Sequence, residues 1–110
     1  MENLDLITAG SVPYNPAELL SSSRMKELID TFRAKYDYII FDAPPVIPLT
    51  DPQVLGAQAD GVLMVVQAGR TQRGIIEHAQ SLLNQAEAKV LGFILTGIRY
   101  HIPQYIYRYL

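Results

Sequence analysis

Residues 36–45 read Tyr-Asp-Tyr-Ile-Ile-Phe-Asp-Ala-Pro-Pro, an apolar segment that runs straight into one acid, Asp42. A run of β-branched and aromatic residues between hydrophilic flanks is typical of a strand inside a parallel sheet. Ligands of open α/β sheets bind just outside the carboxyl ends of the strands, where a carboxylate can hold a hydrated Mg²⁺ beside a nucleotide phosphate. Asp42 therefore fits a Walker B acid. It fits equally well a residue that ends a buried strand by accepting hydrogen bonds from the turn at residues 43–45.

Length and composition favour one compact globular domain, since the chain has 110 residues and 49% of them are hydrophobic. The formal net charge of -2 and the lack of a long basic run give no support for nucleic-acid binding. Cysteine is absent, which excludes disulfides, zinc–thiolate sites and thiol nucleophiles. No apolar run approaches the roughly 20 residues of a membrane span, and the N-terminus lacks a signal-peptide pattern. We therefore expect a cytoplasmic chain without a membrane span.

Strands and helices are predicted to alternate along the chain. Besides residues 36–42, apolar runs predict strands at residues 4–8, 61–67 and 89–96. Cap-and-proline signals and helical periodicity predict two short helices or one kinked helix from Asn15 to Tyr36, and further helices after Asp51 and after Thr71. This order requires a parallel sheet with helices on both faces, which is a three-layer α/β fold.

Further polar side chains follow the same strand ends as Asp42. They are Thr50, Asp51, Arg70, Thr71, Arg73 and Thr96. Thr50, Asp51 and Thr71 are explained more simply as helix caps than as ligand contacts. The two arginines could meet phosphate or an acidic partner, or they could form a solvated pair on a loop. His78 and His101 lie far apart in a sequence without clustered acids, so no histidine metal site is expected.

The C-terminal tail is rich in tyrosine: Tyr100, Tyr105, Tyr107 and Tyr109 fall within the last eleven residues. Alternation of the last three would place them on one face of a strand, whereas Pro103 and the chain end favour a mobile segment. Phosphorylation would add up to about two negative charges to each tyrosine. Phosphoacceptor sites, an edge strand and an aromatic docking surface for another chain therefore remain open readings.

Four blocks in order carry a resemblance to a known family. They are Asn-Leu-Asp-Leu-Ile-Thr-Ala-Gly from Asn3, Asn-Pro-Ala-Glu-Leu-Leu-Ser-Ser from Asn15, residues 36–45 followed by Leu-Thr-Asp, and the tyrosine tail. Together they resemble the C-terminal half of a bacterial tyrosine autokinase, a P-loop kinase of capsule and exopolysaccharide synthesis. The resemblance implies a P-loop fold, ATP with Mg²⁺, autophosphorylation of C-terminal tyrosines in neighbouring subunits, and control of polysaccharide chain length with a membrane partner.

The resemblance also implies roles for particular residues. Asp42 matches the Walker B acid, which binds Mg²⁺ through water, and Pro44 and Thr96 are expected to contact the nucleotide. Thr96 departs from the asparagine that related ATPases often place near the adenine. The acceptor cluster matches the tyrosines of the tail, Tyr100, Tyr105, Tyr107 and Tyr109.

The phosphate-binding motifs of the family are the main departure. No Gly-x-x-x-x-Gly-Lys-[Ser/Thr] sequence occurs in the chain, so the amide cradle and the lysine for the β- and γ-phosphates are missing. The second acidic motif expected before Asn3 is missing too. In such folds the P-loop strand lies between the Walker B strand and the strand at residues 61–67. We therefore expect either direct pairing of those two strands or a gap filled by another polypeptide.

The sequence thus predicts a partial P-loop kinase domain at residues 1–98, lacking the P-loop strand, and a tyrosine-rich tail at residues 99–110. We expect a kinase-derived chain that is inactive alone, with a P-loop-bearing kinase half or further copies of itself as partners. A membrane chain-length-determinant activator would hold it at the inner face of the plasma membrane. The alternatives are a non-catalytic binding module, a phosphoacceptor subunit, or a remnant of a partition-type ATPase.

Overall fold

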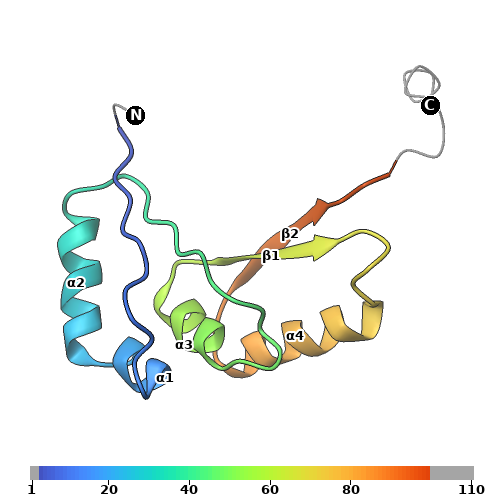
Figure 1. Ribbon diagram of the computed structural model, residues 1–110, viewed down its shortest axis with the longest axis horizontal. Helices are drawn as coiled ribbons and strands as arrows, with labels where there is room; N and C mark the ends of the chain where they lie inside the picture. The colour runs from blue at the N-terminus through green and yellow to red at the C-terminus, as the bar shows by residue number, and fades with distance from the viewer. Residues whose placement is uncertain (1–2, 100–110) are drawn as a thin grey trace. The chain divides into compact units, whose positions relative to one another are not determined.

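The computed structural model describes residues 3–99 and divides the chain into two compact units, Met1–Phe41 and Asp42–Leu110 (Figure 1). The first unit holds two helices, α1 (Pro16–Leu20) and α2 (Ser23–Arg33). The second unit holds the helices α3 (Asp51–Gln58) and α4 (Arg73–Gln85) and the strands β1 (Val62–Gln67) and β2 (Val90–Thr96). The tail boundary predicted at residue 98 stays a prediction, because residues 100–110 lie outside the described part.

The two helices of the first unit are separate, as one of the sequence alternatives predicted. Pro16 occupies the first turn of α1, where its missing N–H costs no hydrogen bond. Ser22 lies between the helices and starts α2, because its hydroxyl accepts a hydrogen bond of 3.2 Å from the backbone N–H of Met25. Ile29 is the buried residue of α2. The serine cap therefore fixes where the chain breaks and resumes its helix.

The second unit is a β-α-β arrangement with a parallel sheet, which confirms the predicted α/β class. β1 and β2 pair in parallel, with Met64 opposite Phe93 and Gln67 opposite Thr96. Helix α4 runs along one face of this pair (Figure 1). Ala79 and Leu83 of α4 form the buried core together with Met64 and with Ala88 of the following turn. The apolar stripe of α4 and alternate residues of β1 thus meet as their periodicities predict.

The other face of the sheet is apolar and open. Side chains alternate along a strand, so Leu63 and Val65 point away from the face that carries Met64. They are 57% and 67% exposed, and Ile94, opposite Val65 on β2, is 44% exposed. Among the described residues the sheet has two strands, so each strand keeps one unpaired edge.

Two predicted strands are wrong, since residues 4–8 and 36–42 form neither helix nor strand. A strand exists only where its backbone groups pair with a neighbouring strand. In the first unit the two segments meet instead through side chains, because the Tyr36 hydroxyl donates to the Asp5 carboxylate. Tyr38 and Ile40 consequently remain 88% and 90% exposed. The apolar pattern of residues 36–42 is real, but this segment pairs with no strand among the described residues, β1 included.

Helices of the described part are too short or too polar to cross a membrane.

Candidate functional site

The carboxyl ends of β1 and β2 lie together, as the predicted site requires. Gln67 ends β1 opposite Thr96, and the N–H of Ala68 donates to the carbonyl of Thr96 at 2.8 Å. After each of the two strands the backbone turns at a glycine with positive φ, Gly69 at 70° after β1 and Gly97 at 66° after β2. A side chain is strained in that conformation, so glycine allows each strand to end abruptly at this rim.

Thr96 is exposed at the rim, but its hydroxyl already has a partner. The Thr96 Oγ1 donates to the carbonyl oxygen of Val66 at 3.3 Å. This hydrogen bond ties the ends of the two strands together. It leaves the lone pairs of the hydroxyl oxygen as acceptors for a ligand donor. Nucleotide contact by Thr96 therefore stays a prediction. In such a contact the Thr96 hydroxyl would accept a hydrogen bond from the nucleotide, because it already donates to Val66.

The loop after β1 folds back on the strand. The carbonyl of Gln67 accepts from the N–H groups of Arg70 and Thr71 at 3.2 and 3.0 Å, and the N–H of Gln67 donates to the Thr71 hydroxyl at 3.1 Å. The expectation that Thr71 caps α4 is wrong, because the N-cap is Gln72. Thr71 instead closes the loop on Gln67. Gln67 is a rim residue that was not predicted from the sequence, although its position at the end of an apolar strand could have indicated it.

The other capping expectations are met in part. Asn15 is the N-cap of α1, as expected, although its side-chain Nδ2 donates to the Glu18 carboxylate at 3.1 Å and its side-chain oxygen accepts no hydrogen bond from a backbone N–H of the helix. Thr50 is the N-cap of α3 without a side-chain cap bond, and Asp51 is the first helical residue rather than the cap. Helix α3 therefore begins one residue earlier than predicted.

The two arginines differ in their surroundings. Arg73 pairs with Glu77 one turn along α4, with Nε 2.8 Å from Oε1, and both side chains are well exposed at 92% and 62%. Such a surface pair contributes little to the free energy of unfolding, so Arg73 could leave Glu77 and pair with another anion at little cost. The side chain of Arg70 is exposed and has no partner among the described residues. Arg70 is therefore the arginine that remains available to a phosphate or an acidic group.

Asp42 and Pro44 are exposed and lie in the segment that leads to α3. Among the described residues none donates a hydrogen bond to the Asp42 carboxylate, so the turn at residues 43–45 does not occupy it. Mg²⁺ is commonly held by one or two carboxylates together with waters and substrate phosphates, and a single exposed carboxylate fits that mode. No group of three or more potential ligand side chains forms within residues 3–99. Asp42 could therefore supply one ligand of such a site, and the phosphates would have to be held by other groups.

The predicted acceptor tyrosines lie outside the described residues. They are Tyr100, Tyr105, Tyr107 and Tyr109. The structure thus brings together Gln67, Thr71 and Thr96, and leaves Asp42, Pro44 and the acceptors as sequence predictions.

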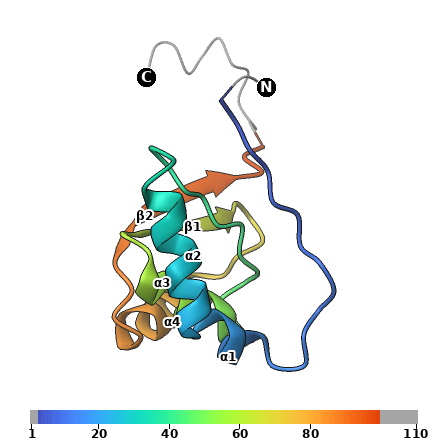
Figure 2. The ribbon, with the colours of Figure 1, turned by 90° about the vertical axis from the view of Figure 1, so that its left-hand side faces the viewer.

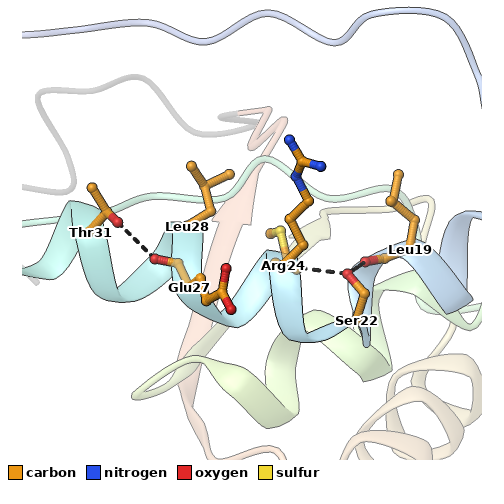
Figure 3. Close-up of a pocket in the computed structure, with 7 residues that line it drawn as sticks. Leu19, Ser22, Arg24, Glu27, Leu28 and Thr31 are labelled. Atoms are coloured by element: carbon orange, nitrogen blue, oxygen red, sulfur yellow. Dashed lines mark hydrogen bonds between the residues drawn. The ribbon is translucent and has the colours of Figure 1, made fainter.

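A shallow pocket lies along α1 and α2 in the first unit, and none of its lining residues is a predicted site residue (Figure 3). Its hydroxyl groups already bond to nearby backbone carbonyls: the Ser22 Oγ donates to the Leu19 carbonyl at 2.7 Å, and the Thr31 Oγ1 donates to the Glu27 carbonyl at 2.8 Å. Leu19, Met25 and Leu28 form its apolar part. Few polar groups converge on this hollow, so it does not resemble a site that orients a small ligand.

Curated relatives of the chain carry the name tyrosine-protein kinase. The chain is 44% identical over 96 residues to the tyrosine-protein kinase YwqD of Bacillus subtilis, covering 87% of this chain and 40% of that protein. It is 41% identical over 104 residues to the putative tyrosine-protein kinase EpsB of Ralstonia nicotianae, covering 94% of this chain and 14% of EpsB. The chain thus spans well under half the length of these relatives. No protein-family model matches it.

Solved structures agree with this result. The kinase domain of VpsO superposes with a TM-score of 0.78 at 33% identity, covering 84% of this chain and 46% of that one. The chimerical protein CapA2B2 superposes with a TM-score of 0.77 at 31% identity, covering 83% and 40%. Sequence and fold agree over most of the chain, which is therefore a homologue of part of a bacterial tyrosine-protein kinase.

Proposed function

We propose that the chain is the C-terminal portion of an ATP- and Mg²⁺-dependent bacterial protein-tyrosine kinase of capsule and exopolysaccharide synthesis. In this proposal it is inactive alone and works with a polypeptide that supplies the phosphate cradle. The observation that carries the proposal is the 44% identity over 96 residues to a tyrosine-protein kinase. The superposition on the kinase domain of VpsO with a TM-score of 0.78 supports it.

Asp42 and the tail have separate roles in this proposal. Asp42 would hold hydrated Mg²⁺ beside the nucleotide phosphates, and Tyr100, Tyr105, Tyr107 and Tyr109 would accept phosphate. The bound ion neutralises charge that develops on the transferring phosphoryl group. Phosphoryl transfer depends mainly on positioning and charge stabilisation. A chain without the Gly-x-x-x-x-Gly-Lys-[Ser/Thr] cradle should therefore have almost no activity of its own.

The open face of the sheet supports a partner that completes the domain. Leu63 and Val65 are 57% and 67% exposed on the face opposite α4, and Ile94 continues the apolar surface on β2. Contiguous exposed apolar surface marks an interaction site or an aggregation liability. The free edge of the sheet also offers unpaired backbone groups to an added strand. A P-loop-bearing kinase half would satisfy both surfaces, and a further copy of this chain is the second possibility.

The membrane connection rests on the resemblance. We propose that the chain lies in the cytoplasm and is held at the inner face of the plasma membrane by a chain-length-determinant activator protein. The likeness of this chain to the chimerical protein CapA2B2, whose solved structure aligns with 83% of it, is the comparison that supports a partner protein in this proposal.

A phosphorylation assay tests the proposal. The purified chain is incubated with ATP and Mg²⁺, alone and with full-length YwqD of Bacillus subtilis, and phosphotyrosine is located by mass spectrometry. We expect label on the tail only in the mixture. Label on the chain alone would contradict its inactivity, and an unlabelled tail in both reactions would contradict the kinase-substrate relationship.

Two variants make the assay specific for the open face of the sheet. Val65→Lys places a charge on that face and should lower tail labelling in the mixture at least tenfold. Asn84→Lys places the same charge on the exposed side of α4 and should leave labelling unchanged. Equal effects of the two substitutions would show that the partner does not use the open face.

A phosphoacceptor or binding subunit is the second candidate, favoured by the missing phosphate cradle. It predicts that Asp42→Asn leaves tail labelling by an intact kinase unchanged, because the catalytic acid would then come from the kinase. The kinase-half proposal predicts that the same substitution abolishes label in any mixture where this chain completes the active site. ATP hydrolysis without tyrosine labelling would instead favour the partition-type ATPase remnant.

A further inference from the structure

The chain has seven tyrosines, and three of them lie in the described part: Tyr14, Tyr36 and Tyr38. All three belong to the first unit, outside the tail that the family resemblance concerns. Their surroundings differ sharply. This difference allows the three hydroxyl groups to be ranked as candidate acceptors.

Tyr36 is engaged by three neighbouring side chains. Its hydroxyl donates to the Asp5 carboxylate, and its ring packs edge-on against Phe32 with 5.9 Å between the ring centroids. The Lys35 ammonium lies 5.1 Å from the centroid of the same ring. The hydrogen bond between the Lys35 ammonium and the Tyr36 side chain is the main cause of the raised pKa of Lys35. Phosphorylation of Tyr36 would have to break these contacts first, and it would place a phosphate beside a carboxylate.

Tyr38 is 88% exposed but follows Asp37 directly. The adjacent carboxylate is a like charge for the incoming triphosphate. Accessibility favours Tyr38 over Tyr36, whereas local charge makes it a weaker acceptor than a tyrosine in a neutral surrounding.

Tyr14 is the free tyrosine of the unit. Its side chain is 99% exposed. Figure 2 shows the segment before α1 as an open loop that stands away from α2. The nearest charged residues in the sequence are Asp5 and Glu18. Packing therefore does not oppose the approach of a triphosphate to the Tyr14 hydroxyl, and no carboxylate is adjacent to Tyr14 in the sequence, in contrast to Tyr38.

The backbone around Tyr14 is equally free. Residues 6–14 form no helix or strand, and none of their backbone groups takes part in a hydrogen bond within the described part. A hypothetical Cβ at Gly10 would meet no heavy atom within 4 Å, so the chain there is uncrowded. A kinase can draw in such a segment without first breaking native hydrogen bonds, and opening a structured segment would add to the free-energy cost of binding.

We propose that Tyr14 is an additional phosphoacceptor, modified by a tyrosine kinase with a nucleoside triphosphate as donor. The inference rests on the proposed function. The phenolic oxygen of Tyr14 forms a bond to the γ-phosphorus while the bond from that phosphorus to the β–γ bridging oxygen breaks. The nucleoside diphosphate leaves, and the phenolic proton passes to a base or to solvent.

Phosphate on Tyr14 would act on the start of α1. It adds about 1.5 to 2 negative charges at neutral pH. Asn15 follows directly, and its Nδ2 donates to the Glu18 carboxylate at 3.1 Å. Repulsion between the phosphate and Glu18 would loosen this first turn. Phosphorylation of Tyr14 is therefore expected to increase hydrogen exchange at α1 and to leave α4 unchanged.

The test uses a chain in which Tyr100, Tyr105, Tyr107 and Tyr109 are all replaced by phenylalanine. Full-length YwqD with ATP and Mg²⁺ is the kinase, and the time course of labelling at each remaining tyrosine is read by mass spectrometry. We expect Tyr14 to be labelled at least tenfold faster than Tyr36. Tyr14→Phe should remove most of the remaining label, whereas Tyr36→Phe should remove little of it.

Two controls separate the possible failures. Tyr14→Phe should leave the unfolding midpoint unchanged, because the ring is 99% exposed. An unlabelled Tyr14 in a reaction where the tail of the intact chain is labelled would overturn this inference alone. Absence of label from both sites would overturn the proposed function and this inference with it. Equal labelling of Tyr14 and Tyr36 would show that exposure does not select the acceptor.

Discussion

Substitution of Leu83 by alanine tests where the core of the second unit lies. Leu83 is fully buried against Met64, Ala79 and Ala88. Two of these neighbours are alanines, which are too short to fill the space that the lost side chain would leave. A buried Leu→Ala change with little collapse costs about 3 kcal/mol or more in free energy of unfolding. For a unit of this size that loss should lower the melting temperature by roughly 12–24 °C.

Leu63→Ala is the matched control, on the opposite face of the sheet. Leu63 is 57% exposed, so less than half of its side chain is removed from water. Full burial of a leucine contributes about 1.5–3 kcal/mol, and the expected cost is therefore roughly 1 kcal/mol. Urea unfolding followed by circular dichroism measures both variants. A cost for Leu83→Ala below that of Leu63→Ala would refute the placement of the core between α4 and the sheet.

Three further substitutions have defined outcomes. Asp42→Asn should abolish Mg²⁺-dependent tyrosine phosphorylation in a mixture where this chain completes the active site of a P-loop-bearing kinase half, and it should change the free energy of unfolding by less than about 0.5 kcal/mol, since the residue is exposed. Ser22→Ala removes the hydroxyl that caps the N–H of Met25 and should cost about 1 kcal/mol, visible as lost helicity in circular dichroism. Gly56→Ala brings a Cβ within 2.9 Å of the Cβ of Ala88, and this overpacking should cost about 1–3 kcal/mol, offset by roughly 1 kcal/mol of gained helix propensity.

Each of these substitutions has an outcome that would count against the structure. A normal rate with Asp42→Asn would remove Asp42 from the catalytic site, and Asp37→Asn serves as the neutral control. Loss of helicity should be larger for Ser22→Ala than for Ser23→Ala, because Ser23 is already inside α2. A clear gain of stability in Gly56→Ala would mean that α3 does not approach Ala88 closely.

Elements with a complete local pattern could be predicted from the sequence. The strands predicted at residues 61–67 and 89–96 match β1 and β2 to within one residue at each end. The helix predicted after Thr71 from its apolar periodicity is α4, which buries Ala79 and Leu83. In these elements the chain supplies both the pattern and the surface against which it packs, since β1, α4 and β2 follow one another directly.

The errors arise where an element depends on a partner elsewhere. Residues 36–42 have the composition of a buried strand, but composition cannot supply the neighbouring backbone with which a strand must pair. Thr71 was predicted as a cap because threonine favours that position, yet its hydroxyl bonds to the N–H of Gln67 instead. Asp42 shows the same limit for the site. Its position after an apolar run suggested an acid at a sheet rim, whereas a phosphate site also needs groups that the described residues do not provide.

The free edge of the sheet and the uncovered Leu63 and Val65 have a consequence inside the cell. Newly made copies that do not meet the polypeptide that completes the domain, their counterpart, should aggregate along these strands or be degraded by quality-control proteases. We therefore expect the steady-state abundance of this polypeptide to follow that of its counterpart, so that neither accumulates in excess.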